Sequence, residues 1–168
     1  IPQFKHVPPD NLEKLAKAVT GKTAAVLLEP IRGEGGVRVP PDDYFPGVRE
    51  LCFKNDVLLI LDEVQTSFGR TGKMFGCDHW GVTSDIMCLA KPFAGGLPRG
   101  ITVAKEEIMS SLKIGEHSST FSGRPLVCAA GCAAIEGLVK EKLVERAEKI
   151  GRYFKTKLQE EFKRAKRY

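Results

Sequence analysis

Three runs of apolar residues, each ending in a charged residue, limit most strongly how this chain can fold. They are "TAAVLLE" at residues 23–29, "VLLILDE" at 57–63 and "IMCLAK" at 86–91. Unbroken apolar runs of this length are typical of strands buried on both faces of a parallel sheet. A possible fourth strand is "GITVAK" at residues 100–105. The runs predict an α/β domain with a largely parallel sheet and flanking helices.

Helices are predicted around these strands. A short helix over residues 8–19, capped by Asp10 or Asn11, precedes the first strand, and a helix over residues 42–55 follows it. The segment between the first strand and the second helix, residues 30–41, is rich in Gly and Pro and is predicted to be a loop.

The last part of the chain is predicted to be almost wholly helical. Small residues fill "PLVCAAGCAAIEGLV" at residues 125–139, which suits close packing against a neighbouring element. A long amphipathic helix is then expected within residues 141–168, because apolar residues recur there every three or four positions. This stripe consists of Leu143, Ala147, Ile150, Phe154, Leu158 and Phe162.

Length and charge exclude several classes of protein. A chain of 168 residues can bury the core of one ordinary domain. Its net charge of +5 comes from Lys and Arg interspersed with Glu, so no nucleic-acid partner is expected. The basic tail "FKRAKRY" is interpreted as a solvated helix end. No apolar run approaches the ~18–20 residues of a membrane helix, so no membrane partner is expected.

The five cysteines favour a reducing compartment. Their number is odd and the N-terminal segment lacks the pattern of a secretory signal, so free thiols and a cytoplasmic location are expected. Cys128 and Cys132 lie four residues apart, and Cys77 lies two residues from His79, which is not the spacing of a zinc site. No metal is expected.

Polar residues stand where the predicted strands end. Glu29, Asp62 and Lys91 occupy these positions, and ligands of open α/β sheets bind at the carboxyl ends of the strands. A lysine directly after "IMCLA" is expected to be partly buried, and burial favours the neutral, nucleophilic amine. An acid at a strand end can serve equally as a helix cap or loop anchor.

The segment "LLILDEVQTSFGRTGK" at residues 58–73 allows two interpretations. An ATPase could use the acid for magnesium and the Gly-rich part for phosphate, whereas another enzyme could place the acid beneath a cofactor ring. A phosphate loop requires Gly where Ser67 stands, and Ser or Thr where Met74 stands. Its lysine would also precede the acidic strand, but Lys73 follows it. The cofactor interpretation is therefore favoured.

Four ordered stretches carry a resemblance to a known family. They are "LLEPIRGEGG", "LDEVQTSFGRTGK", "SDIMCLAKPFAGGLPRG" and "HSSTFSGRPLVCAA". Together they resemble the class III aminotransferases, which use pyridoxal phosphate (PLP) and include acetylornithine, ornithine and 4-aminobutyrate aminotransferases. The resemblance runs from about Thr23 to Glu160 and implies the large domain of a fold type I PLP enzyme, truncated at both ends. Residues 1–140 would belong to that domain, and residues 141–168 would lead toward a small domain.

The resemblance implies roles for the residues around the cofactor. Lys91 matches the lysine that binds PLP and moves the proton, and Asp62 matches the acid beneath the pyridine nitrogen; these are the two predicted catalytic residues. Gln65 matches the residue that hydrogen-bonds the phenolic oxygen, and Val64 matches an apolar contact on one ring face. Glu63, between them, is counted with the cofactor-binding residues.

Other residues are implied to serve the substrate or a second subunit. Thr120 matches a hydroxyl that reaches the PLP phosphate of the partner subunit, so a homodimer is expected for the full-length protein. Ser119 and Glu34 match substrate-side positions, and Glu34 could pair with an arginine from later in the chain. Glu29 is expected close to Asp62. The implied reaction is transamination from an ω-amine donor to 2-oxoglutarate, as in arginine biosynthesis.

The chain also departs from the family. Pro92 follows the lysine and is expected to force Lys91 into extended backbone. Arg124 stands where asparagine is usual. Members of the family are more than twice as long as this chain. Three alternatives stay open: a 4-aminobutyrate or lysine-pathway aminotransferase, another PLP chemistry such as an aminomutase or racemase, and an inactive fragment acting as a binding module.

Overall fold

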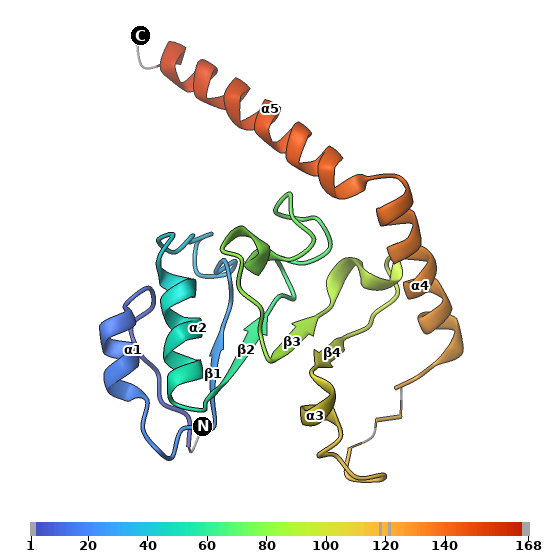
Figure 1. Ribbon diagram of the computed structural model, residues 1–168. Helices are drawn as coiled ribbons and strands as arrows, with labels where there is room; N and C mark the ends of the chain where they lie inside the picture. Colours follow the sequence, from blue (N-terminus) through green and yellow to red (C-terminus); the bar gives the residue numbers. More distant parts are fainter. Residues whose placement is uncertain (1–2, 118, 121, 166–168) are drawn as a thin grey trace.

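A four-stranded sheet forms the centre of the fold. The computed structural model describes residues 3–117, 119–120 and 122–165, and its sheet has the order β1-β2-β3-β4. The strands are β1 (Ala25–Leu28), β2 (Leu58–Asp62), β3 (Ile86–Leu89) and β4 (Ile101–Ala104). The first three run parallel, and β4 pairs antiparallel with β3 (Figure 1). The predicted α/β fold with a largely parallel sheet is confirmed.

The N-terminal helices form where the sequence predicts them, and one of two expected caps is used. They are α1 (Leu12–Ala18) and α2 (Tyr44–Lys54). Asn11 caps α1, because its side-chain oxygen accepts a hydrogen bond of 2.8 Å from the backbone N–H of Lys14. Asp10 instead forms an ion pair of 2.5 Å with Arg32, which ties the start of the chain to the loop after β1.

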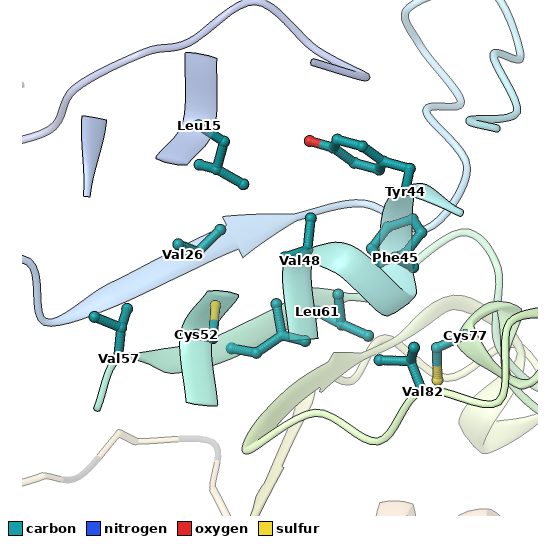
Figure 2. Close-up of a cluster of buried hydrophobic side chains, with 11 residues drawn as sticks. Leu15, Val26, Tyr44, Phe45, Val48, Cys52, Val57, Leu61, Cys77 and Val82 are labelled. Atoms are coloured by element: carbon teal, nitrogen blue, oxygen red, sulfur yellow. The ribbon is translucent and has the colours of Figure 1, made fainter. Parts of the chain in front are cut away.

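The core lies between these helices and one face of the sheet. Figure 2 shows this cluster, in which side chains of α1 and α2 meet those of β1 and β2. Phe45 is fully buried, and its ring lies 5.0 Å from that of Trp80. The opposite face is less covered, since Leu27 is 54% exposed. The remaining buried members include Leu15, Val26, Val48, Cys52, Leu59 and Leu61.

Helices dominate the chain after the sheet. They are α3 (Glu106–Met109), α4 (Pro125–Lys140) and α5 (Leu143–Ala165). The long helix α5 extends away from the sheet (Figure 1), and its apolar stripe is exposed along much of its length. None of the described helices is both long enough and apolar enough to cross a membrane. The predicted division at residues 140 and 141 stays a prediction.

A buried carboxylate, Asp85, ties four elements together just before β3. Its side chain is 6% exposed and forms ion pairs with Arg49 of α2, at 2.7 Å, and with Lys105 after β4, at 2.8 Å. It also accepts a hydrogen bond of 2.8 Å from the backbone N–H of Leu59 in β2. Burial favours the neutral acid, but these three donors outweigh it and lower the pKa of Asp85 from 3.8 to about 2.

We expect Asp85→Asn to lower the free energy of unfolding at pH 7 by about 2 kcal/mol, the value of a shift of nearly two pKa units. Because the folded-state pKa is lowered, this stabilisation is complete above pH 3.8 and is lost as the pH falls toward about 2. Urea unfolding of both proteins across this range should therefore show their stabilities converging at low pH.

The matched control is Glu50→Gln, which removes an exposed pair with Lys54 on α2. Exposed pairs contribute little, so its unfolding midpoint should stay close to that of the wild type. A constant difference between wild type and Asp85→Asn at every pH would contradict the assigned role of the charge.

Candidate functional site

The carboxyl ends of β1, β2 and β3 meet at one edge of the sheet because these strands are parallel. Asp62 is the last residue of β2. Leu28 at the end of β1 pairs with Leu61, so Glu29 follows beside Asp62. Lys91 comes two residues after β3 ends. The structure thus brings Glu29, Asp62 and Lys91 to one edge, as the sequence predicts.

Asp62 is held at the turn that follows β2. Its Oδ1 atom accepts a hydrogen bond of 3.0 Å from the backbone N–H of Val64, and its side chain is half-buried. Cys88 is its register partner on β3. Burial and the nearby charge of Asp62 raise the pKa of the Cys88 thiol, which stays protonated at neutral pH. The negative charge at this point of the edge therefore belongs to Asp62.

Glu63 has no exposed surface, and the structure gives its carboxylate three donors from the protein itself. It accepts hydrogen bonds of 2.8 Å from the backbone N–H groups of Gly76 and Cys77, and one from the hydroxyl of Thr66. Leu59, Leu61 and Glu63 are all fully buried whereas Asp62 is half-buried, so Glu63 continues the buried side of β2 beyond the end of the strand. Its carboxylate joins the turn after β2 to the loop near residue 76, and direct cofactor binding by Glu63 stays a prediction.

Gln65 and Glu34, which are 31 residues apart, meet above this edge. The Nε2 atom of Gln65 donates a hydrogen bond of 3.2 Å to Glu34 Oε1. Gly33 makes this approach possible, because a Cβ there would lie 2.6–2.8 Å from the Gln65 amide atoms. The backbone N–H of Gly33 also donates to Glu29 Oε2 at 3.2 Å. The loop after β1 is thereby fixed against the turn after β2.

Lys91 adopts a backbone conformation that differs from the expectation. It begins a 3-10 helix, Lys91–Ala94, with a φ of +48°, so the expectation that Pro92 forces extended backbone at Lys91 is wrong. The extended residue is Ala90, with φ −160° and ψ −140°. The side chain of Lys91 is exposed, so the expected partial burial is also wrong. The chain leaves the sheet at Leu89 and turns outward, which presents the lysine at the edge.

Ser119 and Thr120 lie apart from the other predicted site residues. Both are exposed, in the segment that precedes α4. Ser119 is engaged locally, since its carbonyl accepts a hydrogen bond of 2.9 Å from the hydroxyl of Ser122. Within the described ranges, no hydrogen bond joins either residue to Asp62 or Lys91. Their roles toward a partner subunit and a substrate stay predictions.

The Gly-rich segment after Gln65 is shaped by packing against α5. Gly69 and Gly72 have φ values of +85° and +87°. A Cβ on Gly69 would lie 3.2 Å from the Val144 side chain, and one on Gly72 would overlap the side chain of Glu148. Both glycines have the left-handed backbone that favours glycine, and α5 packs over them, which accounts for "FGRTGK" without a bound phosphate.

Three residues that hold the predicted site residues in place were not predicted from the sequence. Gly33 admits Gln65, and Thr66 and Gly76 complete the hydrogen bonds of Glu63. Gly33 had a visible signal, since it directly precedes the predicted substrate-side acid. Thr66, three residues after a buried acid, has the spacing of a local side-chain hydrogen bond.

Arg124, which stands where the resemblance leads us to expect asparagine, is the N-cap of α4. It precedes Pro125, which suits the first turn of a helix.

Comparisons with known proteins agree with this geometry. The family described as aminotransferase class-III matches residues 3–167. The acetylornithine aminotransferase of Methanothermobacter thermautotrophicus is 52% identical over 157 residues, which cover 94% of this chain and 40% of that protein. This chain thus spans about 40% of the length of that relative.

Solved structures show the same relationship. The ornithine delta-aminotransferase of Plasmodium falciparum superposes with a TM-score of 0.90 at 44% identity, covering 97% of this chain and 43% of that one. The acetylornithine aminotransferase of Elizabethkingia anophelis gives a TM-score of 0.92 at 40% identity, covering 96% and 42%. From the match of the family over nearly the whole chain, and from these relatives, this protein belongs to the class III aminotransferases.

Proposed function

We propose that this chain is the central, cofactor-binding part of a longer PLP-dependent aminotransferase. In this proposal, an amino group moves from an ω-amine donor of the acetylornithine or ornithine type to 2-oxoglutarate. The observation that carries it is the position of Lys91 and Asp62 at the carboxyl ends of two adjacent strands, at one edge of the sheet. Asp62 is the last residue of β2, and Lys91 follows β3. The names of the relatives support the donor class. A cytoplasmic location stays a prediction.

The residues at this edge fit PLP. The cofactor requires an amine for its aldehyde, an acid for its ring nitrogen and a donor for its phenolic oxygen, and Lys91, Asp62 and Gln65 supply these groups. The Gln65 amide reaches the edge because Gly33 has no side chain. When bound, PLP supplies an electron sink for the carbon that loses a proton. Asp62 would keep the ring nitrogen protonated, since a nearby carboxylate favours the cation.

Lys91 would perform the proton transfer. Its Nζ atom would hold the cofactor at the aldehyde carbon. When free, the same Nζ atom would act as the base that accepts the proton from the amine-bearing carbon of the donor, and it would carry that proton. An exposed lysine at the edge of the sheet has the freedom that both tasks require.

Glu63 would act indirectly, by fixing the turn that carries Asp62, Val64 and Gln65. Its three internal hydrogen bonds hold that turn against the loop at residues 75–77. Val64 would then cover one face of the ring. In this proposal Glu63 is a positioning residue.

Glu34 would govern which substrate enters. It is exposed and hydrogen-bonded to Gln65, so it stands on the outer side of the proposed cofactor site. There it could pair with an arginine when no substrate carboxylate is present, and release that arginine to 2-oxoglutarate in the second half-reaction. One site could thus accept an ω-amine donor and a dicarboxylate in turn.

We expect Lys91 to carry the cofactor in the full-length protein. Borohydride treatment with PLP present, followed by peptide mapping, should place one pyridoxyl group on Lys91, because Lys91 follows the strand next to the one that ends at Asp62. The Lys91→Ala variant should lose the label. A label on Lys73 or Lys105 in the wild type would overturn the assignment.

We expect the active sites to lie between two subunits. Lys91→Ala and Thr120→Ala variants, each inactive alone, should recover activity when they are mixed, unfolded and refolded together. Random pairing leaves one intact site in half of the dimers, so recovery should approach about one-quarter of wild-type activity for a two-fold dimer. Each variant refolded alone is the control, and an active monomer without recovery would refute the shared site.

We expect Glu34→Gln to shift donor preference toward glutamate, because it removes the charge that would neutralise an arginine but keeps an oxygen for Gln65. Half-reaction rates with acetylornithine, ornithine and glutamate should show a shift of about tenfold, or ~1.4 kcal/mol, in the ratio of rates. Glu50→Gln, on the surface of α2, is the control. An unchanged ratio in Glu34→Gln would show that Glu34 does not select the donor.

A further inference from the structure

The turn that carries Lys91 is in an unfavourable backbone conformation and must be held by its surroundings. Lys91 has a φ of +48° and precedes Pro92. Left-handed backbone is unfavourable for a residue with a Cβ, and a following proline restricts it further. Such conformations persist where surrounding contacts determine them. The contacts that hold this turn therefore determine where the lysine stands.

One of these contacts is made by Phe93, two residues after Lys91. Its ring lies directly over Gly131 of α4, where a Cβ would approach the Cε1 and Cε2 atoms to 2.7 and 2.8 Å. Gly131 is buried, although most of α4 is exposed. Helix interiors disfavour glycine relative to alanine. A ring that occupies the position of the missing side chain gives a reason for glycine at this point.

Phe93 also contacts the loop that carries the other site residues. Its ring centroid lies 6.1 Å from that of Phe68, and Phe68 lies 6.4 Å from Phe75. Phe68 follows Gln65 by three residues and has a φ of +56°. One aromatic side chain thus bridges α4, the Lys91 turn and the loop after β2.

We infer that Phe93 is a positioning residue for Lys91, and that Gly131 is the socket that receives its ring. This inference rests on the proposed function, in which Lys91 bonds to the cofactor beside Asp62. The Phe93 ring contacts α4 on one side and Phe68 on the other, and these two contacts hold the turn in place. They thereby set the distance between Lys91 and the loop that carries Asp62 and Gln65. The pair works by complementary size: a large ring on the turn and no side chain on the helix.

The test uses the full-length protein and five variants, two of which are controls. Gly131→Ala fills the socket, Phe93→Ala empties it, and Phe93→Leu combined with Gly131→Ala exchanges size between the two sides. Gly137→Ala is the matched control, because it makes the same change on the same helix where a Cβ meets no atom within 4 Å. Phe53→Ala, at an exposed ring of α2, is the control for loss of a phenyl group.

The readout is the rate at which added PLP becomes fixed to Lys91 in the apo protein, trapped by borohydride and quantified by peptide mapping. Gly131→Ala and Phe93→Ala should slow this attachment by about 10- to 100-fold, since an ångström-scale displacement of a reacting group has effects of that size. The exchanged pair should return to within about threefold of wild type, because the contact is restored and the two substitutions are coupled. Gly137→Ala and Phe53→Ala should attach PLP at the wild-type rate.

Each outcome of this experiment either supports or overturns the positioning role of Phe93. Wild-type rates in Phe93→Ala would overturn the positioning role, whatever the stability of the other variants. If Gly131→Ala does not fold, the exchanged pair decides: recovery of folding and attachment supports the socket, and failure overturns it. Absence of label on Lys91 in the wild type itself would refute the proposed function instead, so the two failures are distinguishable.

Discussion

The buried charge of Asp85 is the interaction on which the arrangement of the sheet most depends. It holds α2 through Arg49, β2 through the Leu59 backbone and the end of β4 through Lys105. Because Asp85 directly precedes β3, it ties these three elements to the start of β3, at the end of the sheet opposite the candidate site. Glu63 plays the corresponding part at the other end, where it has only N–H and hydroxyl donors. A buried carboxylate thus lies near each end of β2, with Asp85 bound to the Leu59 backbone near the start of the strand and Glu63 directly after its last residue.

The position of the candidate site follows from this registration. Parallel pairing of β1, β2 and β3 brings Glu29, Asp62 and Lys91 to a common edge, although no hydrogen bond among the described residues joins their side chains. The finer arrangement depends on side-chain contacts between loops, such as Gln65 with Glu34. Strand register therefore sets which residues meet, and the loops set how closely they approach. A class III aminotransferase needs both, because its chemistry places several groups around one ring.

The sequence was sufficient for features that depend on local pattern. Apolar runs predicted the strands, because a strand buried on both faces needs apolar residues in succession. It was insufficient for Lys91, since the rule for residues before proline favours extended backbone and the contact of Phe93 with Gly131, far along the chain, prevails. The burial of the Glu63 side chain could not be predicted from the sequence either, because the backbone N–H of Gly76, which donates a hydrogen bond to it, lies 13 residues later in the chain. The role expected for Thr120 involves a second subunit, and it stays a prediction.

The packing of α5 against Gly69 and Gly72 has a consequence for how this chain acquires its structure. Both glycines lie in the loop that follows Asp62, but their partners, Val144 and Glu148, belong to a helix made much later in synthesis. Contacts between distant parts of a chain cost more loop-closure entropy than local contacts, and such contacts slow folding. The three parallel strands and α2 lie within the first ninety residues or so, and their contacts are local by comparison. The loop that contains Gly69 and Gly72 can reach its final packing only when α5 has formed. This loop, beside the candidate site, is therefore expected to be among the last parts of the chain to fold.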